Sequence, residues 1–208
     1  FFCHGVPSML AWKKYTEWAE KQVGKITYAS WRNKWTGWHD SWAMGIDGEK
    51  HGEKINWHDS YDMLIRGKKS YIESRLSQGD MFYQLFLGDC CLGKQCYDHC
   101  KYKYNHSSAD IRIGDLWGKT YNDDDDGVSG AVAFTQKGNE ILKQCNCELV
   151  EHSFDVVAEG QMKICPQRIG AYNKILKTLK NDSKNIQDAC HILTTYRKQQ
   201  RQLERIKH

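Results

Sequence analysis

The sequence has few prolines, no long apolar run and no visible signal peptide. Only two of its 208 residues are proline, and no apolar run approaches the length of a membrane span. Its nine cysteines are an odd number without regular spacing, so at least one cannot join an internal disulfide. These features argue against a membrane span and against a secreted disulfide scaffold. We therefore expect a reducing compartment, the cytoplasm, where thiols remain available for metal or redox chemistry.

The hydrophobic content and the charge distribution indicate a folded domain with a basic tail. The chain is 40% hydrophobic and contains eight Trp, which is enough to bury a core. Residues 167–208 contain ten Lys or Arg against three Asp or Glu, a net charge of +7, which leaves −3 on the rest of the chain. Such a tail can contact nucleic acid, an acidic partner or a membrane surface, although a solvated helix face is the more common meaning.

Hydrophobic periodicity predicts a mixed α/β domain over residues 1–166, with a single mixed sheet and flanking helices, followed by a basic helical tail over 167–208. Ser8 is a typical helix N-cap, and apolar residues at helical spacing follow it until Gly24. Strands are predicted at 25–32, 41–46, 109–113, 128–134 and, as an edge strand, 148–157. Further helices are predicted at 71–76, at 136–145 behind a Thr135 cap, and from 168 onward with a break at 181–183.

The predicted tail helix carries one apolar stripe, and basic residues occupy the rest of its surface. We expect this stripe to pack against the domain or against another chain. Its members are Ile186, Cys190, Leu193, Tyr196, Leu203 and Ile206.

The N-terminal segment begins without an initiator Met. Phe1-Phe2-Cys3 is apolar, like the end of a buried strand, so we expect the sequence to begin partway through a longer protein.

The most site-like pattern lies between residues 90 and 118. Four of the nine cysteines gather in its first part, beside His99 and His106; they are Cys90, Cys91, Cys96 and Cys100. In the strand that follows, we expect Ile111 and Ile113 on one face and Asp110 and Arg112 on the other.

That strand ends at Gly114-Asp115-Leu116-Trp117-Gly118. A glycine on each side of an acid and a large ring suggests a backbone bend that another group approaches closely. We interpret Asp115 and Trp117 as residues that shape a cofactor site.

Spacing alone leaves three chemistries open for the cysteines. A structural zinc ion needs four ligands, which Cys90 or Cys91 could supply together with Cys96, Cys100 and a His. An iron–sulfur cluster also takes thiolates, often from separated parts of a chain. The third alternative is a set of thiols without any ligand.

Two further patterns have a functional and a structural interpretation. Trp35, Trp38 and Trp42 could stack on a flat ligand, but in a small core such residues are more often packed. The acidic loop 122–127 could hold a cation, but a solvated turn is the better interpretation because the spacing is not that of a calcium loop.

Two motifs resemble those of the coenzyme F420 hydrogenase/dehydrogenase beta subunits. Cys3-His4-Gly5-Val6-Pro7-Ser8 is similar to the CHGVPS signature of that family, and residues 110–118 are similar to its SDITIGDFWG segment. Gly127-Val128-Ser129, Lys137-Gly138 and residues 32–38 match further elements. The resemblance covers residues 1 to about 166.

The resemblance implies the C-terminal domain of an iron–sulfur flavoprotein that binds FAD and a four-iron cluster. It implies cluster ligands on a cysteine of a preceding N-terminal segment and at Cys3, Cys96 and Cys100. The last two are spaced one residue wider than the family's usual pair, which makes Cys91 a candidate substitute ligand. Lys101 and Lys103 could offset the negative charge of the cluster.

From the resemblance we expect an oxidoreductase that transfers electrons between coenzyme F420 or another donor and a redox partner, such as a ferredoxin or another subunit. The alternative is a non-catalytic, zinc-stabilised module that binds a partner. Nucleic-acid binding through the tail and the tryptophans is a third hypothesis, which we do not favour.

Overall fold

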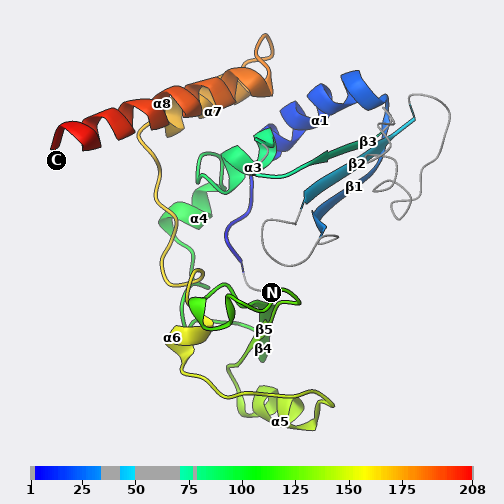
Figure 1. Ribbon diagram of the computed structural model, residues 1–208, viewed down its shortest axis with the longest axis vertical. Helices are drawn as coiled ribbons and strands as arrows, with labels where there is room; N and C mark the ends of the chain where they lie inside the picture. Colours follow the sequence, from blue (N-terminus) through cyan, green and yellow to red (C-terminus); the bar gives the residue numbers. More distant parts are fainter. Residues whose placement is uncertain (1–2, 34–42, 50–70, 77–78, 208) are drawn as a thin grey trace. The chain divides into compact units, whose positions relative to one another are not determined.

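The computed structural model describes residues 3–33, 43–49, 71–76 and 79–207. Within them the chain forms two compact units, each built from two separate stretches of sequence. Unit 1 comprises residues 1–6 and 93–167, and unit 2 comprises residues 7–92 and 168–208. The α-helices and strands of both units are labelled in Figure 1.

Unit 2 begins with helix α1 (Met9–Val23), whose ends are those that the sequence predicts. The Ser8 hydroxyl accepts a hydrogen bond from the Leu10 amide and so caps the first turn. Gly24 ends the helix with a φ of 78°, a left-handed value that glycine adopts without a steric penalty. The buried face of α1 includes Tyr15 and Val23, as the helical spacing predicts.

A three-stranded antiparallel sheet follows, made of β1 (Ile26–Asn33), β2 (Ala43–Gly48) and β3 (Tyr71–Ser74), with β2 in the centre. The helix predicted for 71–76 is therefore wrong. The segment pairs with β2 from Tyr71 opposite Asp47 to Ser74 opposite Met44, and this pairing outweighs a weak local helical pattern. Every residue of β2 is buried.

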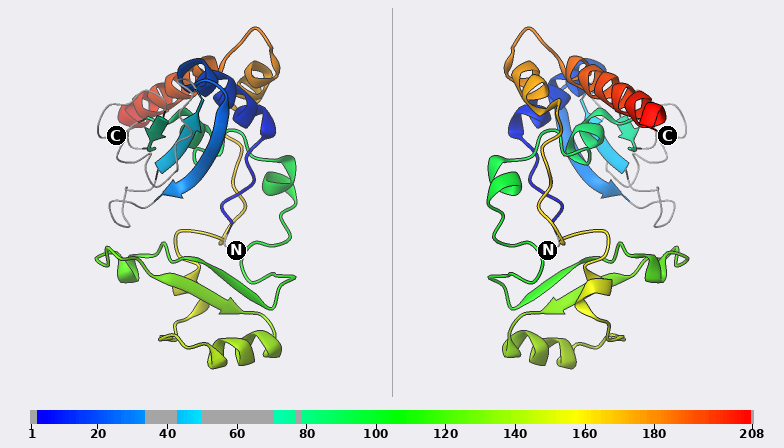
Figure 2. Two further views of the ribbon diagram at one scale, coloured as in Figure 1. Left: turned by 90° about the vertical axis from the view of Figure 1, so that its right-hand side faces the viewer. Right: turned by 90° about the vertical axis from the view of Figure 1, so that its left-hand side faces the viewer.

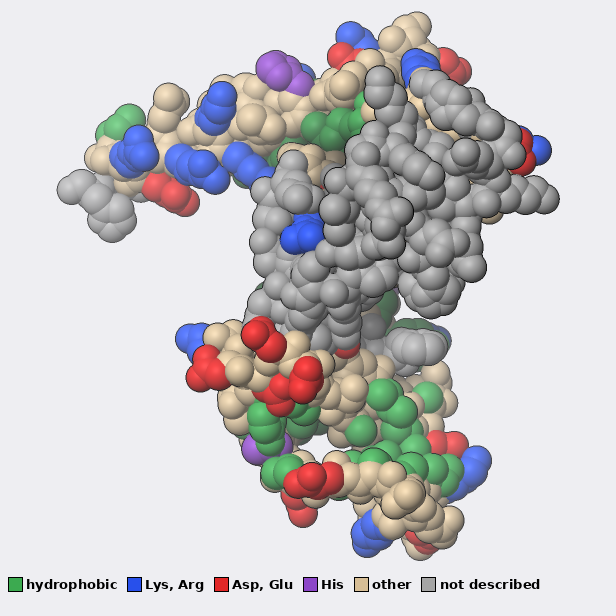
Figure 3. All heavy atoms as spheres, turned by 45° about the vertical axis from the view of Figure 1, so that its right-hand side comes forward, with side chains coloured by type: hydrophobic (Ala, Val, Ile, Leu, Met, Phe, Trp, Pro, Cys, Tyr) green, Lys and Arg blue, Asp and Glu red, His purple; other side chains and the backbone are tan. Residues whose placement is uncertain are grey.

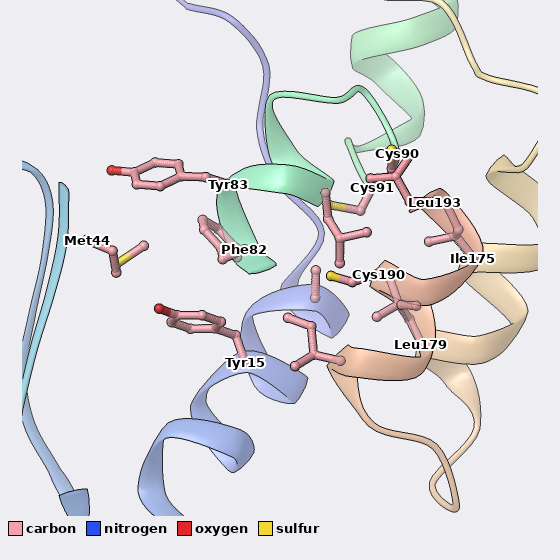
Figure 4. Packing of buried hydrophobic residues seen from close by; sticks show 14 of the residues in the cluster. Tyr15, Met44, Phe82, Tyr83, Cys90, Cys91, Ile175, Leu179, Cys190 and Leu193 are labelled. Atoms are coloured by element: carbon pink, nitrogen blue, oxygen red, sulfur yellow. The ribbon is translucent and has the colours of Figure 1, made fainter. Parts of the chain in front are cut away.

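Helices α3 (Met81–Phe86), α7 (Tyr172–Lys180) and α8 (Ile186–Lys207) complete unit 2. All three contact α1, and α8 also contacts α3 and α7 (Figure 2). Two polar contacts fix this packing: Lys14 Nζ donates to the Asn181 carbonyl oxygen at the end of α7, and Tyr15 donates to Asp80 at the start of α3. Figure 4 shows side chains of α1, α3, α7 and α8 meeting in one apolar cluster.

The predicted break at 181–183 separates α7 from α8, and the tail stripe is confirmed over its first half. Ile186, Cys190 and Leu193 are buried in the core of unit 2. Leu203 and Ile206, by contrast, are 53% and 81% exposed. Lys and Arg side chains gather around this exposed end of α8 (Figure 3).

Unit 1 contains a second, two-stranded antiparallel sheet formed by β4 (Ile111–Asp115) and β5 (Ser129–Ala133). The same unit contains α4 (Lys94–Asp98), the 3-10 helix η1 (Lys119–Tyr121), α5 (Gln136–Gln144) and α6 (Phe154–Val157), and both α5 and α6 contact β5. The edge strand predicted for 148–157 is wrong, because residues 154–157 form α6 instead.

Side chains that precede β4 and begin α5 connect these two elements. Thr135 caps α5 as predicted, and it also donates to a carboxylate oxygen of Asp110 at 2.7 Å. Lys137 pairs with the other oxygen of Asp110. A side chain at Gly138 would overlap the Asp110 carbonyl oxygen, so only glycine allows α5 to approach β4 this closely.

The mixed α/β class is confirmed, with two small antiparallel sheets in the described residues where one mixed sheet was expected. No helix in the described part of the chain has both the length and the apolar character of a membrane span.

Candidate functional site

Three of the predicted ligands, Cys3, Cys96 and Cys100, belong to unit 1. Cys3 arrives on the short N-terminal stretch, Cys96 lies on α4, and Cys100 follows that helix. The Gly93 amide donates to the Val6 carbonyl oxygen at 2.8 Å. The Val6 amide in turn donates to the Cys96 sulfur at 3.3 Å, so the CHGVPS segment is held against the start of α4.

Lys103 ties the N-terminal stretch to the cysteine loop. Its ammonium group donates to the carbonyl oxygens of Cys3 and His4, at 2.9 and 3.1 Å. Partial burial raises the pKa of the Cys3 thiol, Lys103 lowers it, and the neighbouring thiols of Cys96 and Cys100 raise it. The three thiols and one cation therefore share an electrostatic environment.

Arg112 of β4 organises the loop that carries Cys100 and Lys103. Its side chain is only 6% exposed. The guanidinium group donates to three loop carbonyl oxygens, those of Tyr102, Tyr104 and His106, and contacts the sulfur of Met162. It also stacks on the Phe134 ring, 4.8 Å from the centroid.

The charge of Arg112 also acts on the thiols. Burial lowers the pKa of the guanidinium, whereas the thiols of Cys100 and Cys3 raise it. Arg112 is therefore a second cation beside the cysteine group. The sequence predicted that Arg112 and Ile113 lie on opposite faces of β4, and in the structure Arg112 is buried while Ile113 is 50% exposed.

The arrangement does not amount to a site for a single metal ion. No three Cys, His, Asp or Glu side chains among the described residues are placed to hold one ion together. A four-iron cluster spans more space, because each of its cysteines binds a different iron atom.

Cys91 lies in a different environment from the other predicted ligands. It belongs to unit 2, is 1% exposed, and packs in the same core as Cys90 and Cys190 (Figure 4). Burial raises the pKa of each of these three thiols to about 12. A metal ligand must be deprotonated, so this environment favours a packing role for Cys91.

The expected backbone bend after β4 is present, and residues 159–160 approach it closely. A side chain at Gly118 would meet Glu159 Oε2 at 2.7 Å, and Glu159 accepts a hydrogen bond from the Lys119 amide. Trp117, 41% exposed, lies against Gly160, whose φ is 77°.

Asp115 stands three residues beyond Arg112, about 10 Å along the strand. Its carbonyl oxygen accepts a hydrogen bond from Gln161. The role predicted for Asp115 and Trp117 in cofactor binding stays a prediction.

A hollow of about 520 Å³ lies at the acidic loop and is lined by Thr120, Tyr121 and residues 123–126. Four of its lining residues are aspartates, which would repel the diphosphate of FAD. This hollow therefore does not fit that cofactor. The predicted Trp35, Trp38 and Trp42 lie outside the described residues.

The family comparison agrees with the motifs. A family model that describes the C terminus of the beta subunit in coenzyme F420 hydrogenase/dehydrogenase matches residues 1–157, about three quarters of the chain. The chain belongs to this family. The resemblance that its motifs suggested is thereby confirmed, and membership indicates a redox-related role. Searches of curated proteins and of solved structures gave no significant match.

Sequence reasoning missed the role of Arg112 in the site. Arg112 could have been noticed as a basic residue between two isoleucines of a predicted strand. Cys165 lies far from the other cysteines in sequence, but its sulfur is 4.0 Å from the Cys100 carbonyl oxygen.

Proposed function

We propose that this chain carries the iron–sulfur centre of an oxidoreductase of the F420 hydrogenase/dehydrogenase beta type. The observation that supports it is the grouping of Cys3, Cys96 and Cys100 with two cations in unit 1. Cysteine thiolates are the usual ligands of four-iron clusters, and here they come from separated stretches of the chain, as such clusters allow.

The surrounding residues suit the charge of such a centre. When bound, a four-iron cluster carries one electron at a time and has a net negative charge. Lys103 and Arg112 would offset that charge, and the Val6 amide would donate to the sulfur of Cys96. Hydrogen bonds and cations of this kind set both the stability of the thiolates and the reduction potential.

The donor and acceptor are part of the same proposal. We infer that a flavin or deazaflavin, FAD or coenzyme F420, bound outside the acidic hollow, would supply two-electron chemistry and that the cluster would carry single electrons. A ferredoxin or another subunit would be the acceptor, in keeping with a family of beta subunits. We place the reaction in the cytoplasm, where reduced thiols persist.

Anaerobic reconstitution of the 208-residue chain with iron and sulfide tests the proposal. We expect a brown protein with about four iron atoms per chain. Cys96→Ser and Cys100→Ser should each lose more than half of the iron, because each removes a thiolate. Cys147→Ser, which changes an exposed cysteine of the same unit, should lose none.

Cys91→Ser belongs in the same series, and we expect it to retain the iron because Cys91 is a core residue of unit 2. A colourless chain that takes up one zinc ion would favour the zinc-stabilised module instead. Full iron content in both Cys96→Ser and Cys100→Ser would show that the ligands lie elsewhere.

A further inference from the structure

Unit 1 has a pair of exposed thiols, at the end of α5, that the proposed function does not use. Cys145 is the C-cap residue of α5, and Cys147 follows it with only Asn146 between them. Both side chains are exposed, and both are free thiols in the structure. Small molecules in solution can therefore reach either sulfur.

The backbone folds back between these two cysteines. Cys145 leaves the helix with an extended conformation, at a φ of −67° and a ψ of 135°. The Cys147 amide then donates to the Cys145 carbonyl oxygen at 2.9 Å, which closes a three-residue turn. In a fully extended chain the α-carbons of residues two apart are about 7 Å from each other, and the turn draws them closer. Disulfides join residues whose α-carbons lie about 4.4–6.8 Å apart, so the turn holds this pair within bridging range.

The one side-chain contact at this turn does not oppose a bridge. The Cys145 thiol donates to the Ile141 carbonyl oxygen at 3.3 Å, in the last turn of α5. A thiol is a weak hydrogen-bond donor, so little is lost when this side chain rotates away from the helix. Rotation about the bond between the α- and β-carbons of Cys145 can turn its sulfur toward Cys147.

We propose that Cys145 and Cys147 form a redox-active dithiol that exchanges with low-molecular-weight disulfides. The thiolate of one cysteine attacks a sulfur of the small disulfide, which gives a mixed disulfide and releases one small thiol. The second cysteine, as its thiolate, then attacks the protein sulfur of that mixed disulfide and releases the second small thiol. The protein gains the Cys145–Cys147 bond and loses two protons, and two electrons pass to the small disulfide, which is thereby reduced.

The second step is favoured because both thiols belong to one turn. The attacking group is held beside the mixed disulfide at a high effective concentration, which does not depend on the amount of protein. Neighbouring positions in sequence are not sufficient for this chemistry: Cys90 and Cys91 are adjacent, but both are buried, and burial raises the pKa of each thiol to about 12. In a reducing compartment, disulfides that form are usually transient, and they serve catalysis or redox sensing.

Mass spectrometry of one peptide tests the proposal. The reduced 208-residue chain is incubated anaerobically with oxidised glutathione at pH 8, quenched with acid, blocked with N-ethylmaleimide and digested with trypsin. The tryptic peptide 144–163 contains Cys145, Cys147 and no other cysteine. We expect it to carry an internal disulfide and at least about tenfold less glutathione than the same peptide of Cys145→Ser or Cys147→Ser. Each of these variants lacks the second thiol, so its reaction should stop at the mixed disulfide.

Dithiothreitol should then restore two sites for N-ethylmaleimide in the unsubstituted peptide. Glutathione retained on that peptide at the level of the single variants would overturn the proposal. Two free thiols after prolonged incubation, or a bridge from either residue to another cysteine, would overturn it as well. Both substitutions are at exposed positions, so the fold is retained. The test requires no iron, and its outcome is therefore independent of the proposed function.

Discussion

The two units place the same residue type in opposite surroundings. In unit 1, Cys3, Cys96 and Cys100 are exposed or partly exposed and stand near Lys103 and Arg112. In unit 2 the thiols are packed among leucine, isoleucine and aromatic side chains, away from solvent; they are Cys90, Cys91 and Cys190. Cys91 and Cys96 are five positions apart in sequence, but the unit boundary at residues 92 and 93 separates them. Surroundings, and not crowding along the chain, decide which thiols can act as ligands.

The largest expected effect is on thiol reactivity. Burial raises the pKa of Cys90, Cys91 and Cys190 from 9.0 to about 12. Because only the thiolate reacts, each should be labelled by N-ethylmaleimide at least about 10³-fold more slowly than exposed Cys147. Timed labelling of the metal-free chain at pH 8, followed by peptide mass spectrometry, measures these rates.

Labelling in denaturant is the control, since all nine cysteines should then react at similar rates. The proposed difference between the units would be wrong if the labelling rate of Cys91 in the folded chain were within tenfold of the rate of Cys147. In that case the core of unit 2 would open often enough for Cys91 to serve as a ligand.

A second, smaller effect compares the two halves of α8. Leu193 is 1% exposed and packs in the core, whereas Leu203 on the same helix is 53% exposed. Leu193→Ala should lower the free energy of unfolding by about 2–5 kcal/mol, because it removes buried methyl groups and leaves a cavity. Leu203→Ala makes the same chemical change and should cost less than about 0.5 kcal/mol.

Chemical denaturation followed by circular dichroism measures both variants. Equal losses of stability would mean that the exposed end of α8 is covered in solution by something that protects Leu203. A change in oligomeric state of Leu203→Ala alone, detected by light scattering, would identify that cover as a second copy of the chain.

Local signals predicted much of this fold. Ser8 and Thr135 cap helices where the sequence placed caps, and Gly24 ends α1, because capping depends on a few neighbouring residues. The segment 71–76 was assigned wrongly because its partner is β2, more than twenty residues away. Short segments with weak periodicity take their structure from such distant contacts.

The site was harder to predict for the same reason. Alternation along β4 identified two faces but not which of them is buried. An arginine can be buried only when other groups accept its hydrogen bonds. For Arg112 these groups are the carbonyl oxygens of Tyr102, Tyr104 and His106, which the alternation does not reveal. Spacing could not separate Cys91 from Cys96, because the chain crosses from one unit to the other between them.

Arg112 in unit 1 and Asp47 in unit 2 are both buried but differ in their partners, and this difference gives the smallest of the three effects. Arg112 in unit 1 has carbonyl partners, as described above. Asp47, on the central strand of unit 2, is fully buried, and neither of its carboxylate oxygens has a hydrogen-bond partner among the residues that the structure describes. Burial therefore raises the pKa of Asp47 from 3.8 to about 6.

A raised carboxylate pKa makes the folded state bind more protons than the unfolded state between these two values. The contribution of Asp47 to stability is therefore most favourable below pH 4, falls as the pH rises to about 6, and is constant above that value. Asp47→Asn removes the ionisation. Its stability should then fall less than that of the unsubstituted chain between pH 4 and pH 7, by on the order of 2 kcal/mol. Because the polarity of Asn is the same at every pH, the difference between the two curves reports the ionisation alone.

Urea unfolding at several pH values measures the stability of both chains. Asp182→Asn, at an exposed position between α7 and α8, is the control and should leave the shape of the curve of stability against pH unchanged. Parallel curves for Asp47→Asn and the unsubstituted chain would mean that Asp47 is hydrated or paired in solution, and that unit 2 satisfies its buried charge as fully as unit 1 does.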